Sequence, residues 1–257
     1  MSAGGLAVHQ SRYDLKQFLR EPASVFFTAI LPLIFLVLFV AIFGNNRTEI
    51  NGNLIQTSTY YLPAILALSI VNATFVNLAI WVTITRDRGQ LKRLRATPIP
   101  PWAIVTGRAY SALVVAAAMT VLVCGAGVLF YGVSLPSNAL PGALITLFVG
   151  TLSFSALGFA AAALIPSENA APPIANAICL PLEFISGIFV PADQIPKWML
   201  DIAAVFPIKP FFDAMLHTFD PHTTGAGIMP GKLAVLVAWG VVGAIVALRF
   251  FRWSPKR

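Results

Sequence analysis

The sequence contains few charged residues, few histidines and only two cysteines. Charged side chains make up 11% of its 257 residues, whereas 58% of the residues are hydrophobic. A soluble domain carries about 25% charged residues and could not bury this much apolar surface in one core. The composition therefore excludes an ordinary soluble domain and predicts an integral membrane protein.

Residues with chemical reactivity are scarce and scattered. Cys124 and Cys179 lie inside apolar segments, so we expect two small buried side chains rather than a disulfide or a zinc site. The sequence contains no nucleophile elbow, zinc-protease motif or pair of neighbouring carboxylates, and we predict no catalytic residue and no metal ligand. The phosphate-binding motif Gly-x-x-x-x-Gly-Lys-Ser/Thr is also missing. We therefore expect ATP and Mg, if they are used, to be bound by another chain.

The formal net charge is +7. Such an excess suggests nucleic acid in a soluble protein, but here the 17 Lys and Arg residues flank apolar runs, as cytoplasmic loops of membrane proteins do. We therefore expect no nucleic acid partner. Most of these residues fall on one side of the bilayer when the N-terminus is placed inside. This predicts a multi-pass protein of the cell (plasma or inner) membrane with both termini cytoplasmic.

Six apolar segments are long enough to cross a bilayer. They lie at 23–43, 60–84, 102–131, 141–165, 172–190 and 233–251. The predicted fold is an all-α membrane protein whose transmembrane domain, residues 23–257, contains six transmembrane helices. Residues 1–22 are predicted to form an N-terminal interfacial amphipathic helix. Residues 191–232 are predicted to form an outer segment with short re-entrant helices before the last span.

The loop at 85–101 is predicted to lie inside and is strongly basic. Leu91 and Leu94 are three residues apart and would form a small apolar face among the basic side chains. One interpretation is a solvated loop that touches anionic lipid. The other is a docking element for a cytoplasmic partner.

This loop resembles that of the ABC type-2 permeases, in which Glu-Arg-Glu-x-Gly-Thr-Leu-x-x-Leu-x-x-Thr-Pro follows the second span and contributes to contact with the ATPase. The matching residues are Arg86, Gly89, Leu91, Leu94, Thr97 and Pro98. Asp87 stands where a second acid is usual, whereas Thr85 replaces the first Glu, so no salt bridge is carried over to that position. The resemblance implies a set of ATPase-coupling residues: Arg86, Asp87, Arg88, Gly89, Leu91, Lys92, Arg93, Leu94 and Arg95.

A second resemblance to the same family follows the fifth predicted span. The matching stretches are Ser186-Gly187-Ile188-Phe189-Val190-Pro191, Ile195-Pro196-Lys197-Trp198 and Phe206-Pro207. Together the two resemblances imply the permease subunit of an ATP-driven ABC exporter. They also imply two ATPase subunits, which bind ATP and Mg, and a second permease subunit that is identical or homologous. Outward transport is implied by the family resemblance alone.

Several polar and aromatic residues inside the second and fifth spans are candidates for a substrate path. They are Ser69, Asn72, Phe75, Asn77, Asn176, Glu183 and Phe184. Hydrogen bonding between helices is the alternative role for the amides and hydroxyls. Glu183 is the one acid predicted well inside a span, where an ionised group is costly, and both a structural and a functional role stay open for it. The predicted path is mainly apolar, which favours a lipophilic drug-like or lipid-like substrate.

Two other classes of function remain as alternatives. A stand-alone, ion-coupled secondary transporter would use Glu183 as its proton site. A membrane-embedded enzyme is the third class, although no cluster of residues offers chemistry. A protein that co-purifies with a stoichiometric ATPase would favour the ABC permease over both.

Overall fold

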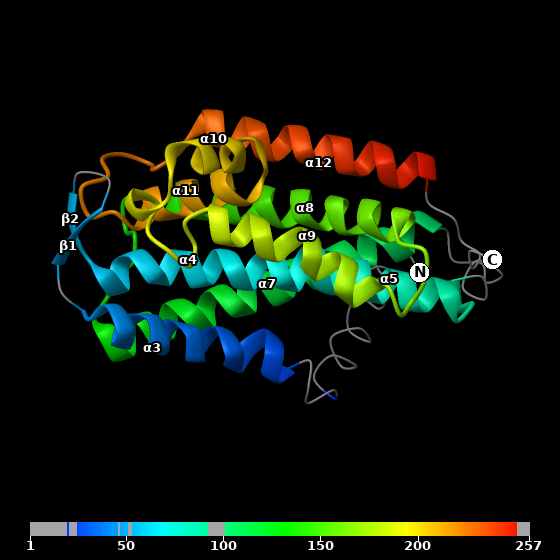
Figure 1. Ribbon diagram of the computed structural model, residues 1–257, viewed down its shortest axis with the longest axis horizontal. Coiled ribbons are helices and arrows are strands. Elements are labelled where there is room, and N and C mark those ends of the chain that lie inside the picture. The colour runs from blue at the N-terminus through cyan, green and yellow to red at the C-terminus, as the bar shows by residue number, and fades with distance from the viewer. Residues whose placement is uncertain (1–19, 21–24, 46, 51–52, 92–100, 251–257) are drawn as a thin grey trace.

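A computed structural model describes residues 20, 25–45, 47–50, 53–91 and 101–250 of the chain. Within these ranges the protein is helical apart from one short hairpin, and its long helices lie alongside one another (Figure 1). The predicted N-terminal helix at 1–22 lies outside the described residues, except for Arg20. The basic segment 92–100 also lies outside them.

The elements follow one another along the chain with short connections. In order they are η1 (Phe26–Ile30), α3 (Leu31–Phe43), β1 (Arg47–Ile50), β2 (Asn53–Gln56), α4 (Thr57–Val71), η2 (Asn72–Val76), α5 (Asn77–Asp87), α7 (Pro101–Tyr131), α8 (Leu140–Leu164), α9 (Ala171–Ile185), η3 (Ala192–Gln194), α10 (Lys197–Val205), α11 (Ile208–Phe219) and α12 (Pro230–Phe250). The antiparallel hairpin β1–β2, with Arg47 opposite Gln56, is absent from the sequence prediction. We call its end of the bundle the hairpin end.

Among the described residues, four helices are long and apolar enough to cross a membrane. They are Thr57–Asp87, which combines α4, η2 and α5, Thr106–Tyr131 within α7, Leu140–Leu164 and Pro230–Phe250. The first and fifth predicted spans correspond to shorter apolar helices, Thr28–Phe43 and Ala171–Ile185. The fifth ends at Ile185 rather than at 190, because Gly187 adopts a φ of +92° that turns the chain out of the helix.

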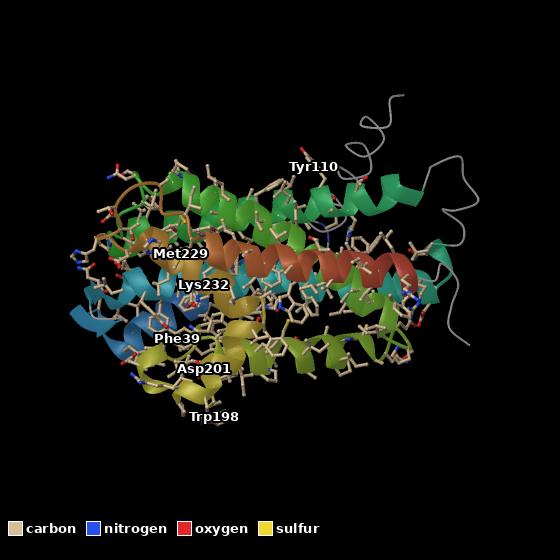
Figure 2. All side chains as sticks on the ribbon, turned by 90° about the horizontal axis from the view of Figure 1, so that it is seen from above. Phe39, Tyr110, Trp198, Asp201, Met229 and Lys232 are labelled. Atoms are coloured by element: carbon tan, nitrogen blue, oxygen red, sulfur yellow. The ribbon has the colours of Figure 1, made fainter. Side chains whose placement is uncertain are left out.

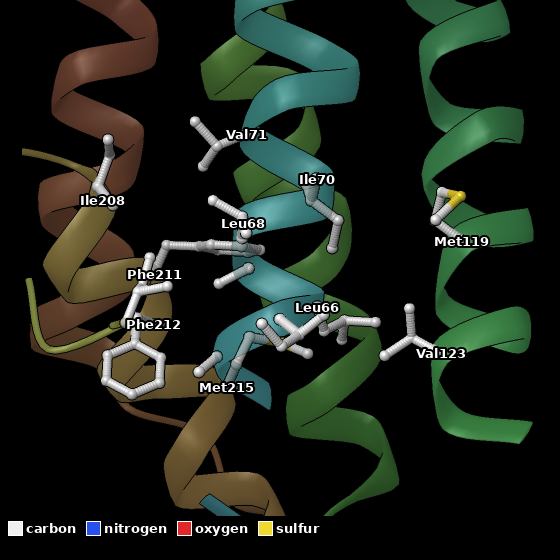
Figure 3. Packing of buried hydrophobic residues seen from close by; sticks show 14 of the residues in the cluster. Leu66, Leu68, Ile70, Val71, Met119, Val123, Ile208, Phe211, Phe212 and Met215 are labelled. Carbon is white, nitrogen blue, oxygen red and sulfur yellow. The ribbon is translucent and has the colours of Figure 1, made fainter. Parts of the chain in front are cut away.

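The long helix α4–η2–α5 lies at the centre of the bundle, and every residue of α4 is buried. On one side α11 places Phe211, Phe212 and Met215 against it, and on the other side α7 contributes Met119 and Val123 (Figure 3). The helix α3 packs along it as well. The central helix is therefore enclosed by elements from both halves of the chain.

The predicted outer segment 191–232 does contain short helices, namely η3, α10 and α11. Trp198 and Asp201 of α10 lie at the edge of the bundle (Figure 2), whereas most of α11 is buried against α4 and α8. Asp213 of α11 accepts hydrogen bonds from Lys209 Nζ at 2.9 Å and from Lys232 Nζ at 2.6 Å. This shared carboxylate attaches α11 to the first turn of α12.

Helices α8 and α12 pack closely because small residues line their contact. A Cβ atom at Gly243 would lie 2.9 Å from the backbone nitrogen of Leu157 and 3.0 Å from the carbonyl carbon of Ala156. At Gly240 it would lie 2.8 Å from Ser153 Oγ. Close approach of two backbones through glycine is a common way for helices to associate in membranes.

We predict that Gly243→Ala destabilises the protein by about 1–3 kcal/mol, because the added methyl group meets backbone atoms that cannot rotate away. Gly125→Ala on α7 is the matched control, since a Cβ there has no atom within 4 Å. The control should be neutral or stabilising by up to about 1 kcal/mol, because Ala favours helix over Gly. Unfolding of the purified protein in mixed detergent measures both, and equal midpoints would contradict the close packing.

Candidate functional site

Arg86 is a buried cation at the end of the bundle opposite the hairpin, which we call the loop end. It belongs to α5, so the predicted loop 85–101 begins later than expected. Its side chain is 1% exposed. Nη1 donates to the Ala162 carbonyl at 2.8 Å, and Nη2 donates to the carbonyls of Ile165 and Pro166 at 3.0 and 3.4 Å.

The location of Arg86 follows from the way α8 ends. The carbonyl of Ala162 would normally accept from the backbone N–H four residues later, but residue 166 is a proline and has none. The last carbonyls of any helix also lack helical partners and carry partial negative charge. The Arg86 guanidinium therefore supplies the donors and the positive charge that the end of α8 needs.

The neighbours of Arg86 bind the connection that leads into α9. Asp87 Oδ1 accepts from Arg86 Nε at 2.9 Å, and Oδ2 accepts from the Glu168 backbone N–H at 2.7 Å. Arg88 Nε is 2.9 Å from Glu168 Oε2, in a pair whose arginine is 60% exposed. Glu168 is not among the predicted site residues. It lies in the short connection between the fourth and fifth predicted spans, which a chain with a cytoplasmic N-terminus and six spans places on the same side of the bilayer as the basic loop.

Leu91 was predicted to provide apolar docking area, but its side chain is only 2% exposed. It packs in a small cluster with Leu78, Val82 and Phe159. The turn at Gly89, where φ is +68°, directs the chain back toward the bundle. Leu91 therefore anchors the start of the loop in this structure. The other predicted coupling residues beyond it, Lys92, Arg93, Leu94 and Arg95, lie outside the described residues.

The structure brings together two of the predicted path residues, Asn72 and Glu183. Glu183 of α9 is 1% exposed, and its Oε1 accepts from Asn72 Nδ2 at 3.2 Å. The same Nδ2 donates to the Leu68 carbonyl at 2.9 Å. Asn72 also begins the π-helical turn η2, a rare conformation that occurs frequently at functional sites. The middle of the second predicted span is thus joined to the fifth by a buried polar contact.

The remaining path candidates do not gather around this contact. Ser69 is buried and bonds the Ile65 carbonyl of its own helix at 2.7 Å, and Asn77 is exposed. Asn176 bonds the Pro172 carbonyl of its own helix at 2.9 Å. Phe184 is exposed and packs on Phe189, with ring centroids 4.6 Å apart. Phe75 is buried and faces an apolar cavity described below.

A third contact joins the second helix to the chain after α9. Tyr60 of α4 donates its hydroxyl to the Gly187 carbonyl at 2.5 Å. A Cβ at Gly187 would lie 3.3 Å from Phe212 and 3.4 Å from the Tyr60 hydroxyl, so both its positive φ and its surroundings favour glycine. This explains the glycine of the Ser186-Gly187 pair in the motif that follows the fifth predicted span.

The helix α4–η2–α5 therefore contacts the α9 region at three levels. They are Glu168 at the loop end, Glu183 in the middle and Gly187 toward the hairpin end. Within the described residues no group of three or more His, Cys, Asp or Glu side chains lies together. The three contacts connect the second helix to the α9 region by hydrogen bonds.

The four described helices that are long and apolar enough to cross a bilayer indicate a multi-pass membrane protein. The profile of the ABC-2 type transporter family matches residues 10–219. The chain therefore belongs to the ABC-2 type transporter family and is a membrane permease of that family.

Two relatives illustrate the similarity. The chain is 28% identical over 252 residues to the "Daunorubicin resistance ABC transporter permease protein DrrB1" of Streptomyces coeruleorubidus, a match that covers 91% of this chain and 82% of that protein. It is 24% identical over 167 residues to the "Probable multidrug ABC transporter permease YbhR" of Escherichia coli (strain K12). That match covers 65% of this chain and 45% of YbhR, so it spans less than half of the length of that relative.

Replacing Arg86 tests its role at the end of α8. We predict that Arg86→Met destabilises the protein by roughly 3–5 kcal/mol, because Asp87 and the α8 carbonyls lose their buried partner. Arg88→Met is the matched control and should cost less than about 1 kcal/mol, since its ion pair is exposed. Thermal unfolding in detergent compares the two variants, and similar losses would show that Arg86 has no special structural role.

Proposed function

We propose that this chain is the transmembrane permease subunit of an ATP-driven ABC exporter. It moves a lipophilic drug-like or lipid-like substrate outward along a path at the interface of two permease subunits. Two separate ATPase subunits bind ATP and Mg, and the second permease is identical or homologous. The proposal is supported by the family and by relatives named for multidrug and daunorubicin resistance.

The observation that carries the proposed mechanism is the attachment of α9 to the second helix at three levels. The loop end is the cytoplasmic end in this proposal, and the ATPase pushes on the coupling segment 86–95. The displacement reaches α9 along two routes: through Asp87 and Arg88 to Glu168, and along α5 to the contact between Asn72 and Glu183. The second and fifth predicted spans then move together, which closes the path inside and opens it outside.

The face of α9 that points away from the bundle supports a permease interface. Leu180 is 46% exposed and Phe184 is 54% exposed. These apolar side chains are oriented to contact a second permease subunit along the proposed path. Arg88, which is exposed, and the basic residues that follow Leu91 supply charge complementarity for the ATPase.

One observation favours the alternative of a stand-alone ion-coupled transporter. Glu183 is almost completely buried, and its carboxylate bonds a neutral amide. A buried carboxylate of this kind is a candidate for proton exchange. Purification of the tagged chain from its native membrane separates the two proposals. A stoichiometric ATPase and ATP-dependent transport in proteoliposomes support the exporter, whereas transport driven by a proton gradient without an ATPase supports the alternative.

Substitution of Glu183 distinguishes the ATP-driven exporter from the ion-coupled transporter. In the exporter, Glu183→Gln should keep ATP-driven transport close to the wild-type rate, because an amide oxygen still accepts from Asn72. Glu183→Leu should reduce transport several-fold, since it removes one hydrogen bond of about 1 kcal/mol between the two helices. Initial rates in proteoliposomes measure both variants. If Glu183→Gln abolishes transport while the complex stays assembled, proton exchange is the role of Glu183.

A further inference from the structure

An apolar cavity of about 140 Å³ lies in the middle of the bundle, between α9 and the pair formed by α8 and α12. Its walls come from five separated parts of the chain. Phe75 belongs to the second helix, Phe154 to α8, Cys179 and Leu182 to α9, Ile208 to α11 and Trp239 to α12. Among the described atoms, no nitrogen or oxygen contributes to its surface.

The cavity exists because of how α9 is held. This helix packs on η2 and α5 and on the short helices α10 and α11. Glu183 of α9 bonds Asn72 of the second helix, and Glu168 in the connection before α9 bonds Asp87 of the same helix. Meanwhile α8 and α12 are drawn tightly together at Gly240 and Gly243. The space that remains between α9 and this pair is the cavity.

The junction of α10 and α11 closes one side of the cavity through a fixed contact. Trp239 donates its indole N–H to the Val205 carbonyl at 2.7 Å and stacks on Phe206 with ring centroids 5.7 Å apart. The indole nitrogen is thereby satisfied, and the tryptophan presents carbon atoms to the cavity. At the rim, Ile178 is 43% exposed. The cavity therefore opens to the surroundings of the bundle beside α9.

The chemistry of the walls restricts the occupant to apolar groups. A buried water molecule needs two to four polar partners, and this surface offers none. A cavity of about 150 Å³ lined by aliphatic and aromatic groups is known to stay dry and to bind benzene. The volume here is close to that value, so one ring, or a few carbons of a chain, fits within it.

We propose that this cavity is a binding site for the aromatic ring of a neutral or amphipathic lipophilic compound dissolved in the bilayer, which enters beside Ile178. The rest of a larger compound extends past the rim into lipid. Binding depends only on the cavity. Its use as the first station of transport rests on the proposed exporter function.

A photoreactive single-ring probe tests the site. The probe is 3-trifluoromethyl-3-(m-iodophenyl)diazirine, which partitions into bilayers, and the protein is the full chain, together with any ATPase that co-purifies with it, in phosphatidylcholine nanodiscs. We expect labelling of Phe75, Cys179 and Leu182 to saturate as the probe concentration rises. Val121 and Leu248, which are 74% and 87% exposed, should be labelled in proportion to the probe because their side chains lie on the outside of the bundle and do not line the cavity.

A substitution that fills the cavity tests whether the saturable labelling arises there. Cys179→Phe should reduce the saturable labelling by about tenfold, because the ring occupies the space that the probe needs. The matched control is Cys124→Phe, the same substitution at the other cysteine, on α7 and away from the cavity; it should leave saturation unchanged. Cys179→Ala enlarges the cavity without adding bulk and should retain saturable labelling, which covers the case in which Cys179→Phe does not fold.

Two results would overturn the proposal. One is labelling of the cavity residues only in proportion to the probe, or no labelling of them at all, because either result would mean that the cavity does not bind the ring as a distinct site. The other is saturable labelling that persists in a folded Cys179→Phe variant. Export is assayed separately on the same complexes. Saturable labelling without ATP-driven export would contradict the proposed function and leave the site intact, whereas export without saturable labelling would remove only the site.

Discussion

A polar side chain inside an apolar bundle has to find its partner within the protein, and this constraint determines which helices stay together. Polar side chains at three levels of the central helix do so. Arg86 binds the end of α8, Asn72 binds the Glu183 carboxylate, and Tyr60 binds the Gly187 carbonyl. Apolar packing surrounds these contacts but has little directional preference. The polar contacts therefore set the register between the central helix and its neighbours.

The long helices could be predicted from the sequence because their apolar runs exceed the length that a bilayer requires. Asn72 and Glu183 could also be selected, since amides and acids are conspicuous in such runs. The burial of Arg86 could not be predicted from the sequence. It depends on Pro166, which is 80 positions away and leaves a carbonyl of α8 without a donor. Leu91 likewise resembled an exposed docking residue, because its partners Leu78 and Phe159 are brought to it only by the fold.

The cavity could not be predicted from the sequence of any single helix. Phe75, Cys179 and Trp239 each look like ordinary apolar residues of separate helices. They come to face one space because α9 is held toward the second helix while α8 and α12 are held toward each other. A void of this kind arises because α9 contacts the second helix more closely than it contacts α8 and α12. The chain therefore combines a closely packed pair of helices with a neighbour that has room to move.

The close fit of α12 on α8 has a consequence for how the protein is made. Synthesis proceeds from the N-terminus, so α8 enters the membrane before the residues of α12 exist. Until then, the backbone near Ala156 and Leu157 borders lipid or the insertion machinery. Docking of α12 is thus among the last steps of maturation. A chain that ends before Gly243 leaves this face of α8 uncovered.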